Sequence, residues 1–195
     1  MTSSPSDTAA VVHPLQGFAD EVATAVGGTA KVSFDTIKIT VSPESWVDAH
    51  RIARDDLDLV FFSWLSAIDW SNEVESGDSL SEEVEERIEM VTTVGDLSEG
   101  RRVTFSTTLH KDAPSIASLV DVYAGANWHE REASEMFGID FEGHPDLSHL
   151  YLPDSFIGNP LKKSYPLLSR EVKPWPGMVD VEAMPEKPST ENPEA

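Results

Sequence analysis

The residues most suited to chemistry lie between positions 128 and 144, in the run WHEREASEMFGIDFEGH. Within this run, Glu130, Arg131 and Glu132 place a guanidinium between two carboxylates. A guanidinium holds carboxylates through paired, planar hydrogen bonds that lysine cannot copy. The cluster therefore indicates either a solvated helix end or a helix clamped on both sides, with Arg131 bridging acids of its own chain or of a partner.

The histidines allow a different chemistry, that of a free-standing metal-dependent enzyme using His129, Glu132, His144 and His149. The run from His129 begins like the HExxH motif of zinc enzymes, but Ala133 stands where the second histidine should be. Histidines in turns are more often hydrogen-bonded structural groups than ligands. The metal enzyme is therefore the less favoured alternative, and no metal site is expected.

A short helix over about 128–137 is expected to position the cluster. Asn127 is a good N-cap because its side-chain oxygen can accept hydrogen bonds from free backbone N–H groups, and Glu130 completes a capping box. Gly138 supplies the end of the helix. The two faces carry Glu130, Ala133 and Phe137 on one side and Trp128, Glu132 and Glu135 on the other. An apolar group on each face indicates a helix that is at least partly buried.

Composition excludes several classes of function. A chain of 195 residues is long enough for one domain with a sizeable core. The absence of cysteine excludes disulfides, thiolate nucleophiles and cysteine-ligated iron–sulfur clusters or zinc fingers. A net charge of −21 disfavours nucleic-acid binding, because phosphate contacts need lysine and arginine. The start of the chain shows no signal-peptide pattern. The apolar window 57–68 is too short to span a bilayer and predicts a buried strand. The chain is therefore expected to be soluble or held at a membrane by partners.

Periodicity predicts an α+β fold, with a mixed or antiparallel sheet flanked by helices in a single core domain over 13–144. Helical spacing and cap residues predict helices over 14–26, 43–55 and 114–123. Alternating or apolar runs predict strands over 31–34, 37–41, 59–68, 87–94 and 102–109. Residues 71–86 form an acidic excursion between two strands, and we expect a solvated loop because EF-hand spacing is absent. Residues 1–12 are expected to be a flexible N-terminus.

After Phe141 the composition changes, since nine of the thirteen prolines lie from Pro145 onward. Proline fixes φ and removes a backbone donor, so residues 145–177 are expected to form a long, extended arm. This arm keeps large apolar residues and a basic island of Lys162, Lys163, Arg170 and Lys173. Such an arm either binds partners or folds back on its own sheet, and different portions can do each. We expect partners to order residues 158–177, and an acidic, proline-rich tail to follow over 178–195.

Two stretches resemble the 30-kDa subunit family of respiratory complex I, the proton-pumping NADH–quinone oxidoreductase, in its bacterial form. The first comprises Glu130, Arg131 and Glu132, then Glu135, Met136 and Phe137, and finally His144. The second is GNPLKKSYPL, which contains Pro160, Leu161, Lys162, Lys163, Tyr165 and Pro166. The run REVKPWPG over 170–177 is similar to the tail of some bacterial members, and the resemblance covers at least 115–177. The chain departs from the family at Ser148-His149, where the family usually has a basic residue or proline and often a second base after it, and at Asn159, where histidine is common.

The resemblance implies a non-catalytic structural subunit in the peripheral arm of the complex. Its partners would be the large subunit that forms the quinone site and the small subunit that carries the terminal cluster, which it would brace during NADH-to-quinone electron transfer coupled to proton translocation. It implies no cofactor on this chain, because iron–sulfur clusters, FMN and quinone are bound by partner subunits. It also implies a peripheral place on the cytoplasmic face of the cell membrane, with membrane contact only through partners.

Three alternatives stay open beside this expectation. One is the matching subunit of a related membrane-bound hydrogenase or F420-linked dehydrogenase, although REVKPWPG favours the respiratory form. Another is an assembly chaperone that leaves the finished complex. The third is the metal-dependent enzyme described above.

Overall fold

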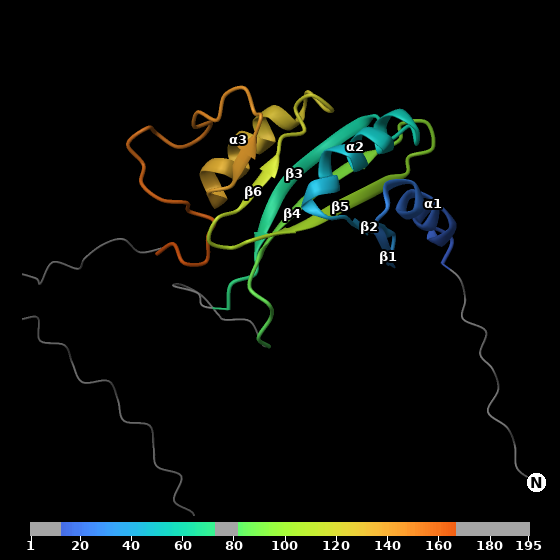
Figure 1. The fold of residues 1–195 in the computed structure, drawn as a ribbon, viewed down its shortest axis with the longest axis horizontal. Coiled ribbons are helices and arrows are strands. Elements are labelled where there is room, and N and C mark those ends of the chain that lie inside the picture. The colour runs from blue at the N-terminus through green and yellow to red at the C-terminus, as the bar shows by residue number, and fades with distance from the viewer. Residues whose placement is uncertain (1–12, 73–81, 167–195) are drawn as a thin grey trace, which may run out of the picture.

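The computed structural model describes residues 13–72 and 82–166 (Figure 1). Their main sheet has five strands in the order β1-β2-β5-β4-β3. The strands are β1 Thr29–Ser33, β2 Thr36–Thr40, β3 Phe61–Asp69, β4 Ile88–Gly95 and β5 Arg102–Leu109. β2 and β5 pair in parallel, whereas the other neighbours pair antiparallel. The predicted α+β class with a mixed sheet is therefore confirmed.

Two helices cover one face of the sheet, α1 Gln16–Val26 and α2 Trp46–Asp55. Their ends follow the local sequence. Gly27 ends α1 with a left-handed backbone (φ 68°), a conformation that costs glycine little. The side chain of Ser42 accepts a hydrogen bond from the backbone N–H of Ser45 in the 3-10 turn Pro43–Ser45, which leads into α2.

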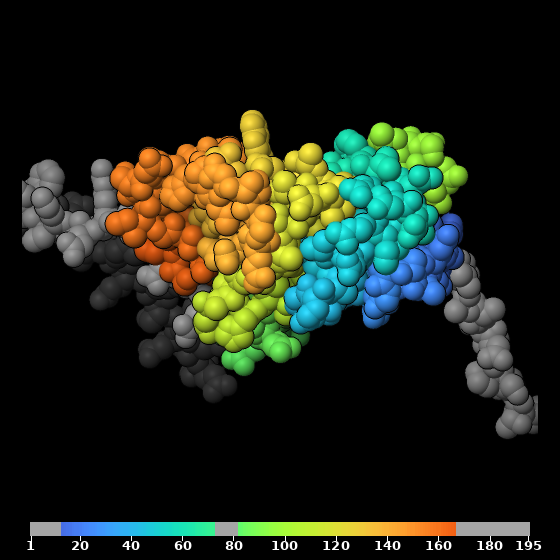
Figure 2. Space-filling model, turned by 45° about the horizontal axis from the view of Figure 1, so that its top comes forward, coloured from blue at the N-terminus to red at the C-terminus, as the bar shows by residue number. Residues whose placement is uncertain are grey.

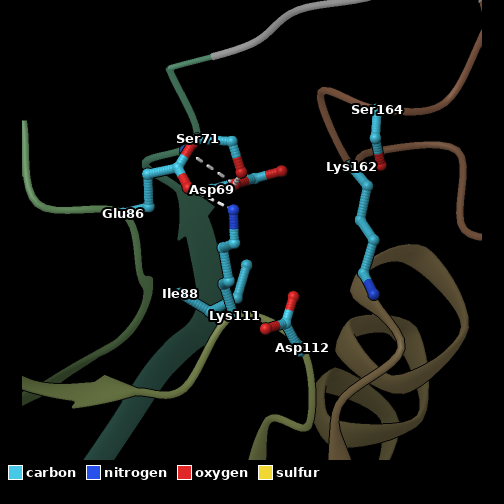
Figure 3. Close-up of a pocket in the computed structure, with 8 residues that line it drawn as sticks. All are labelled: Asp69, Ser71, Glu86, Ile88, Lys111, Asp112, Lys162 and Ser164. Carbon is cyan, nitrogen blue, oxygen red and sulfur yellow. Dashed lines mark hydrogen bonds and ion pairs between the residues drawn. The ribbon is translucent and has the colours of Figure 1, made fainter. Parts of the chain in front are cut away.

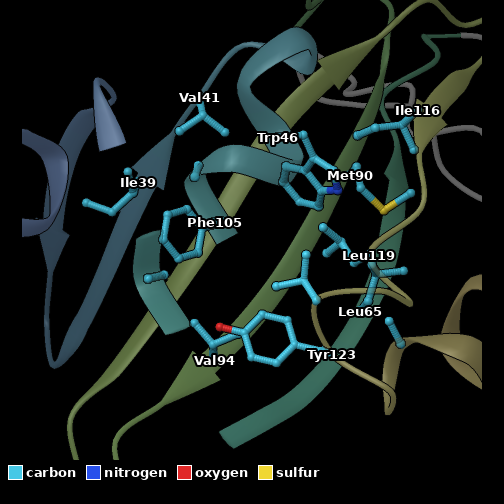
Figure 4. Close-up of a cluster of buried hydrophobic side chains, with 14 of the residues drawn as sticks. Ile39, Val41, Trp46, Leu65, Met90, Val94, Phe105, Ile116, Leu119 and Tyr123 are labelled. Atoms are coloured by element: carbon cyan, nitrogen blue, oxygen red, sulfur yellow. The ribbon is translucent and has the colours of Figure 1, made fainter. Parts of the chain in front are cut away.

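The hydrophobic core lies between these helices and the sheet (Figure 4). Trp46 of α2 and Phe105 of β5 are fully buried in it, and Tyr123 reaches across to donate a hydrogen bond to the carbonyl of Leu59. His50 is buried among these rings and binds the Trp46 carbonyl through Nδ1 at 2.7 Å. Burial lowers the pKa of His50 to about 4, against the opposing effect of that hydrogen bond.

The predicted helix over 114–123 is wrong. Residues Ser115–Ala117 form the short strand β6, which pairs in parallel with β7, Asp140–Glu142. Turns follow, in which the Leu119 carbonyl accepts from the N–H groups of Val122 and Tyr123. Pairing with a strand more than twenty residues later overrides the local helical spacing. The spacing of apolar residues within 114–123 cannot predict this long-range pairing.

Helix α3 spans Ala126–Phe137 and ends at Gly138, whose φ of 69° confirms the predicted stop. The predicted N-cap is wrong, because Gly125 occupies that position and no side chain caps the helix. Asn127 lies inside the first turn, where its carbonyl contacts His144 Nε2 at 3.2 Å. The predicted capping box fails with it, since Glu130 points into the protein and is fully buried.

The run 59–68 contains a strand as predicted, but it is buried on one face only, through Leu65 and Ala67. β3 is an edge strand of the sheet, and Trp64 and Ile68 stay 39% and 43% exposed on its outer face. A register irregularity between Phe62 and Trp64 accompanies this edge position. The acidic excursion joins β3 to β4 as predicted, and its residues 73–81 lie outside the described part of the chain.

Residues 145–166 run beside α3 without forming a helix or strand, at the opposite end of the domain from α1 and α2 (Figure 2). They are held by hydrogen bonds to α3 and to the end of β3. The expectation that partners order residues 158–177 is therefore wrong for 158–166, which bind their own domain. Residues 167–177 and the predicted tail 178–195 lie outside the described range, as do residues 1–12.

Candidate functional site

Helix α3 and residues 145–166 bring together the side chains of both sequence motifs. The helix packs against β3, where His129 contacts the ring of Phe62 with centroids 5.6 Å apart. Another side of the helix contacts residues 145–166, which we call the C-terminal segment. Three charged residues of α3 make this contact or support it: Glu130, Arg131 and Glu135.

Glu130 joins α3 to the turn after β6. Its Oε2 accepts a hydrogen bond from Ser118 Oγ, and its Oε1 accepts one from the backbone N–H of Leu119, each at 2.6 Å. Burial raises the pKa of Glu130 to about 7, although these two hydrogen bonds act in the opposite direction. A carboxyl group held in this way fixes the helix on the domain.

His144 closes the other side of the same region. Its Nε2 lies 4.0 Å from Glu130 Oε2 and 3.2 Å from the Asn127 carbonyl, and its side chain is fully buried. The backbone N–H of Asp146 donates to His144 Nδ1 at 3.1 Å. Because Nδ1 accepts, the hydrogen-bond partners assign the ring proton to Nε2. The histidine therefore connects α3 to the C-terminal segment through one hydrogen bond at each ring nitrogen.

Glu135 holds the C-terminal segment through its carboxylate. Its two oxygens accept from the backbone N–H groups of Leu150 and Tyr151 at 3.0 Å and of Leu152 at 3.3 Å. The side chain is buried, and a carboxylate with three backbone donors is strongly stabilised. One α3 side chain thereby orders three successive residues of a proline-rich loop.

Arg131 makes a second contact with the same loop. Its guanidinium donates to the carbonyls of Ser148 and His149 at 2.9 Å and to Ser148 Oγ at 3.2 Å. The expectation that Arg131 bridges acids of its own chain is therefore wrong for the described residues. The planar fork of donors suits two neighbouring carbonyls as well as it suits a carboxylate. Glu132 is partly exposed and, within 13–72 and 82–166, its carboxylate has no hydrogen-bond partner.

The GNPLKKSYPL motif continues the contact along α3. Asn159 Nδ2 donates to the carbonyl of Glu135 at 3.0 Å, and the N–H of Leu161 donates to the carbonyl of Met136 at 3.1 Å. Both acceptors are carbonyls at the C-terminal end of the helix, which have no partner within the helix itself. Asn159 thus has a defined role at a position where the sequence departs from its family.

Gly158 and Tyr165 form a close contact within this motif. Gly158 has a φ of 97°, and a Cβ built there would lie 2.8 Å from Tyr165 Cε2. The Tyr165 ring in turn stacks on Phe156, with centroids 6.0 Å apart. Pro160 and Pro166 lie within the motif, and each fixes the backbone φ at its own position. The positive φ and the close tyrosine ring explain why position 158 is a glycine, because any other residue would be strained there.

Lys163 ties the motif to the end of β3. Its backbone N–H donates to Asp69 Oδ2, and its Nζ donates to the Ser71 carbonyl, each at 2.8 Å. Sequence reasoning missed Asp69 and Ser71 entirely. Their one signal was an Asp-x-Ser sequence after an apolar strand, which the structure shows as an Asx turn with Ser71 N donating to Asp69 Oδ1 at 2.9 Å.

A hollow of about 300 Å³ opens beside this tie (Figure 3). It is lined by Asp69, Ser71, Glu86, Ile88, Lys111, Asp112, Lys162 and Ser164. Lys111 is paired with Glu86, so much of the charge is already neutralised inside the hollow. Its three acids and two lysines offer neither a clear anion site nor a clear cation site.

The histidines and acids are not gathered as a metal centre would require. Within the described residues, no group of three or more His, Cys, Asp or Glu side chains is placed to hold a metal ion. His129 faces Phe62, His144 binds the Asn127 carbonyl, and His149 is exposed. No helix in the described ranges is both long and apolar enough to cross a membrane. The arrangement therefore orders a loop on a helix.

Comparison with known proteins identifies a family for this chain. The family described as "Respiratory-chain NADH dehydrogenase, 30 Kd subunit" matches residues 39–171. A relative from Rhodobacter capsulatus, named as a subunit of NADH-quinone oxidoreductase, is 38% identical over 71% of this chain and 64% of its own length. A relative of the same name from Roseiflexus sp. (strain RS-1) is 33% identical over 85% of this chain and 88% of its own.

Two solved structures share the fold. The trypsin-resistant fragment (1-134) of Nqo5 has a TM-score of 0.53 and 22% identity, and it covers 68% of this chain and 98% of the fragment. A chain of the membrane-bound sulfane sulfur reductase, an archaeal respiratory membrane complex, has a TM-score of 0.52 and 19% identity, over 72% of this chain and 77% of its own. At these identities the likeness concerns the fold alone. Because the family match extends over most of the sequence, the chain belongs to the family of the 30 kDa subunit of respiratory-chain NADH dehydrogenase.

Proposed function

We propose that this chain is a non-catalytic structural subunit of a bacterial NADH–quinone oxidoreductase. In this role it lies in the peripheral arm and braces the large quinone-site subunit and the small subunit with the terminal iron–sulfur cluster. The clusters, FMN and quinone belong to partner subunits, and this chain reaches the cytoplasmic face of the membrane only through them. Family membership and the names of the relatives support the proposal.

The observation that carries the structural role is how the motif side chains are used. Glu130, Glu135 and Arg131 direct their hydrogen bonds into this chain, to the 118–119 turn and to residues 148–152. Side chains whose hydrogen-bonding groups are already paired with backbone groups of the same chain are suited to shaping a surface. They are poorly placed to transfer protons or electrons. The surface that they shape is the C-terminal segment on α3.

That surface exposes large apolar side chains that its own domain leaves uncovered. On the C-terminal segment they are Tyr151, Ile157 and Leu161, and Ile157 is 89% exposed; Trp128 is exposed on α3 itself. Exposed aromatic and aliphatic groups on a rigid support are typical anchors of protein interfaces. The C-terminal segment is therefore the face that we assign to partner subunits.

The proposal is tested by identifying the proteins that co-purify with a tagged copy from gently solubilised membranes. It expects a large hydrogenase-like subunit and a small cluster-bearing subunit, with this chain in equal amount in the mature complex. An Ile157→Asp variant should lose most of this recovery, whereas Ser155→Asp, which adds the same charge at a neighbouring exposed site, should keep it. Substoichiometric recovery would indicate an assembly chaperone, and recovery of hydrogenase catalytic subunits would indicate the related complex. Either result would overturn the proposal.

A further inference from the structure

The main sheet has a second face, opposite to α1 and α2 (Figure 1). The side chains of the buried core, such as Ile39, Val94 and Phe105, point toward the helices. The residues that alternate with them on each strand point the other way. On that face Trp64 and Ile68 of β3 stay partly exposed. No helix in the described part of the chain covers them.

This open face contains a hollow of about 240 Å³ that spans four strands. It is lined by Asp35, Thr36, Trp64, Thr93, Arg102 and Thr104. The register places Trp64, Thr93 and Thr104 in one row, since Trp64 pairs with Thr93 and Thr93 pairs with Thr104, and Arg102 lies two residues from Thr104 on the same face of β5. The hydroxyls of Thr93 and Thr104 lie 3.0 Å apart on the floor. The hollow is thus built from the sheet itself.

The lining combines an apolar wall with an available cation. Arg102 is exposed and, among the residues that the structure describes, its guanidinium has neither an ion-pair nor a hydrogen-bond partner. A free guanidinium is suited to a carboxylate, and the face of an indole ring is suited to an apolar side chain. The threonine hydroxyls can donate to or accept from a peptide backbone. These are the groups that bind a short protein segment.

Phe34 extends this surface at the tip of the β1–β2 hairpin, next to Asp35. It is 90% exposed, and its φ of 50° is a conformation that bulky residues rarely adopt. Such strain costs about 1–2 kcal/mol relative to glycine, which would suit the turn better. The fold gains no core contact from this ring, so the combination of strain and exposure points to a contact outside the domain.

The charge of the face selects the partner. Its strands carry Lys31, Lys38 and Arg102 against Glu89, which Lys38 neutralises. Asp35 is the acid at the rim of the hollow. The face is therefore net positive in a chain of net charge −21. That overall charge repels nucleic acid and anionic membranes, whereas a cation and an indole that line the same hollow favour a segment with both a carboxylate and an apolar residue.

We propose that this hollow docks an acidic segment of a partner protein, with a carboxylate on Arg102 and an apolar side chain against Trp64, while Phe34, beyond the β2 end of the hollow, contacts another part of the same partner. The surface lies apart from the C-terminal segment, so the chain would contact partners on two sides. The inference rests on the proposed function, because it requires partners in a stable complex.

The test places a photo-crosslinking p-benzoyl-phenylalanine at position 34, where exposure leaves the fold unaffected. The tagged chain is purified in its complex, irradiated, and the crosslinked peptides are sequenced. We expect a crosslink to an Asp- or Glu-rich segment of another protein. Arg102→Glu should lower its yield about tenfold, as expected for the loss of a charge-assisted pair, whereas Arg51→Glu, the same change at an exposed site on α2, should leave it within about twofold.

Other outcomes overturn the inference in distinguishable ways. Co-purification without any crosslink from position 34 would show that this end of the sheet stays free, while leaving the proposed function intact. A crosslink within the same chain or to a second copy would show a different occupant. A crosslink that is insensitive to Arg102→Glu would exclude the carboxylate contact. Loss of co-purification of the wild-type chain itself would instead reject the proposed function.

Discussion

Glu135 on α3 accepts a hydrogen bond from the backbone N–H of Leu150 at 3.0 Å, the first of three such bonds that hold the C-terminal segment. This contact joins the two motifs of the sequence in one structure. It turns a proline-rich loop into an ordered surface, because each N–H that would otherwise need water finds a buried carboxylate.

Glu135→Gln should loosen the segment without unfolding the domain. An amide offers one acceptor oxygen and no charge, and hydrogen bonds to charged groups contribute about 1.5–3 kcal/mol. Hydrogen exchange at residues 148–152 should accelerate by about ten- to a hundredfold, while exchange in β4 and β5 stays unchanged. Glu132→Gln is the matched control on the same helix, and an equal acceleration in that variant would rule out the specific role of Glu135.

Glu130 should make stability depend on pH. Its pKa rises from an ordinary value of 4.5 to about 7 on folding, so its contribution is fully present below pH 4.5 and is lost as pH rises through 7. Glu130→Gln does not titrate. The stability of this variant relative to the wild type should therefore increase by up to about 3 kcal/mol between pH 4.5 and pH 8, measured by urea unfolding. A difference that is independent of pH would contradict the raised pKa.

His50 should make stability depend on pH in the opposite direction to Glu130. Its pKa falls from 6.5 to about 4 on folding, so its contribution is present above pH 6.5 and is lost as pH falls toward 4. His50→Leu keeps a similar volume and removes the titration. As pH falls from 7 to 4, we expect the free energy of unfolding of this variant to rise by about 3 kcal/mol relative to that of the wild type. In the wild type the two effects partly cancel between pH 4.5 and 6.5, which is why the paired variants are needed.

Gly158→Ala should disrupt the GNPLKKSYPL motif more than a strained backbone alone explains. The added Cβ would meet both an unfavourable φ and the Tyr165 ring at 2.8 Å. Gly143→Ala is the matched control, since its φ is 84° but nothing lies within 4 Å of the Cβ. The control should cost about 1–2 kcal/mol, and Gly158→Ala should cost more and expose Lys162 and Lys163 to trypsin. Equal effects would mean that the tyrosine contact is unimportant.

The parts of the fold that were predicted correctly depend on neighbouring residues. The helix end at Gly138 and the neighbouring strands predicted over 87–94 and 102–109 each follow from a short stretch with defined turn chemistry. The segment 114–123 has helical spacing too, yet its partner strand lies at 140–142 and decides the outcome. No local pattern carries that information.

The site shows the same limit. The charge cluster and the resemblance to a family motif identified Glu130, Arg131 and Glu135 as important, but not what they bind. Their partners lie 11 to 18 residues away, and Lys163 meets Asp69 across 94 residues of sequence. An acid next to an arginine also looks like an ion pair in the sequence, whereas the structure directs Arg131 to carbonyls. Which of these partners a side chain binds depends on which distant segment the fold brings next to it.

The central claim is that the motif side chains build a surface for assembly and carry no chemistry. The most direct measurement is NADH–quinone turnover per assembled complex in an Arg131→Ala variant, with the amount of complex read from native gels. Arg131 holds three oxygen atoms of the C-terminal segment from a partly exposed position, so its loss should cost about 1–3 kcal/mol. We expect severalfold less assembled complex, with turnover per complex within about twofold of the wild type, and no change for Arg51→Ala on α2. Full assembly with turnover reduced about a hundredfold would contradict the account, because it would make Arg131 a catalytic residue.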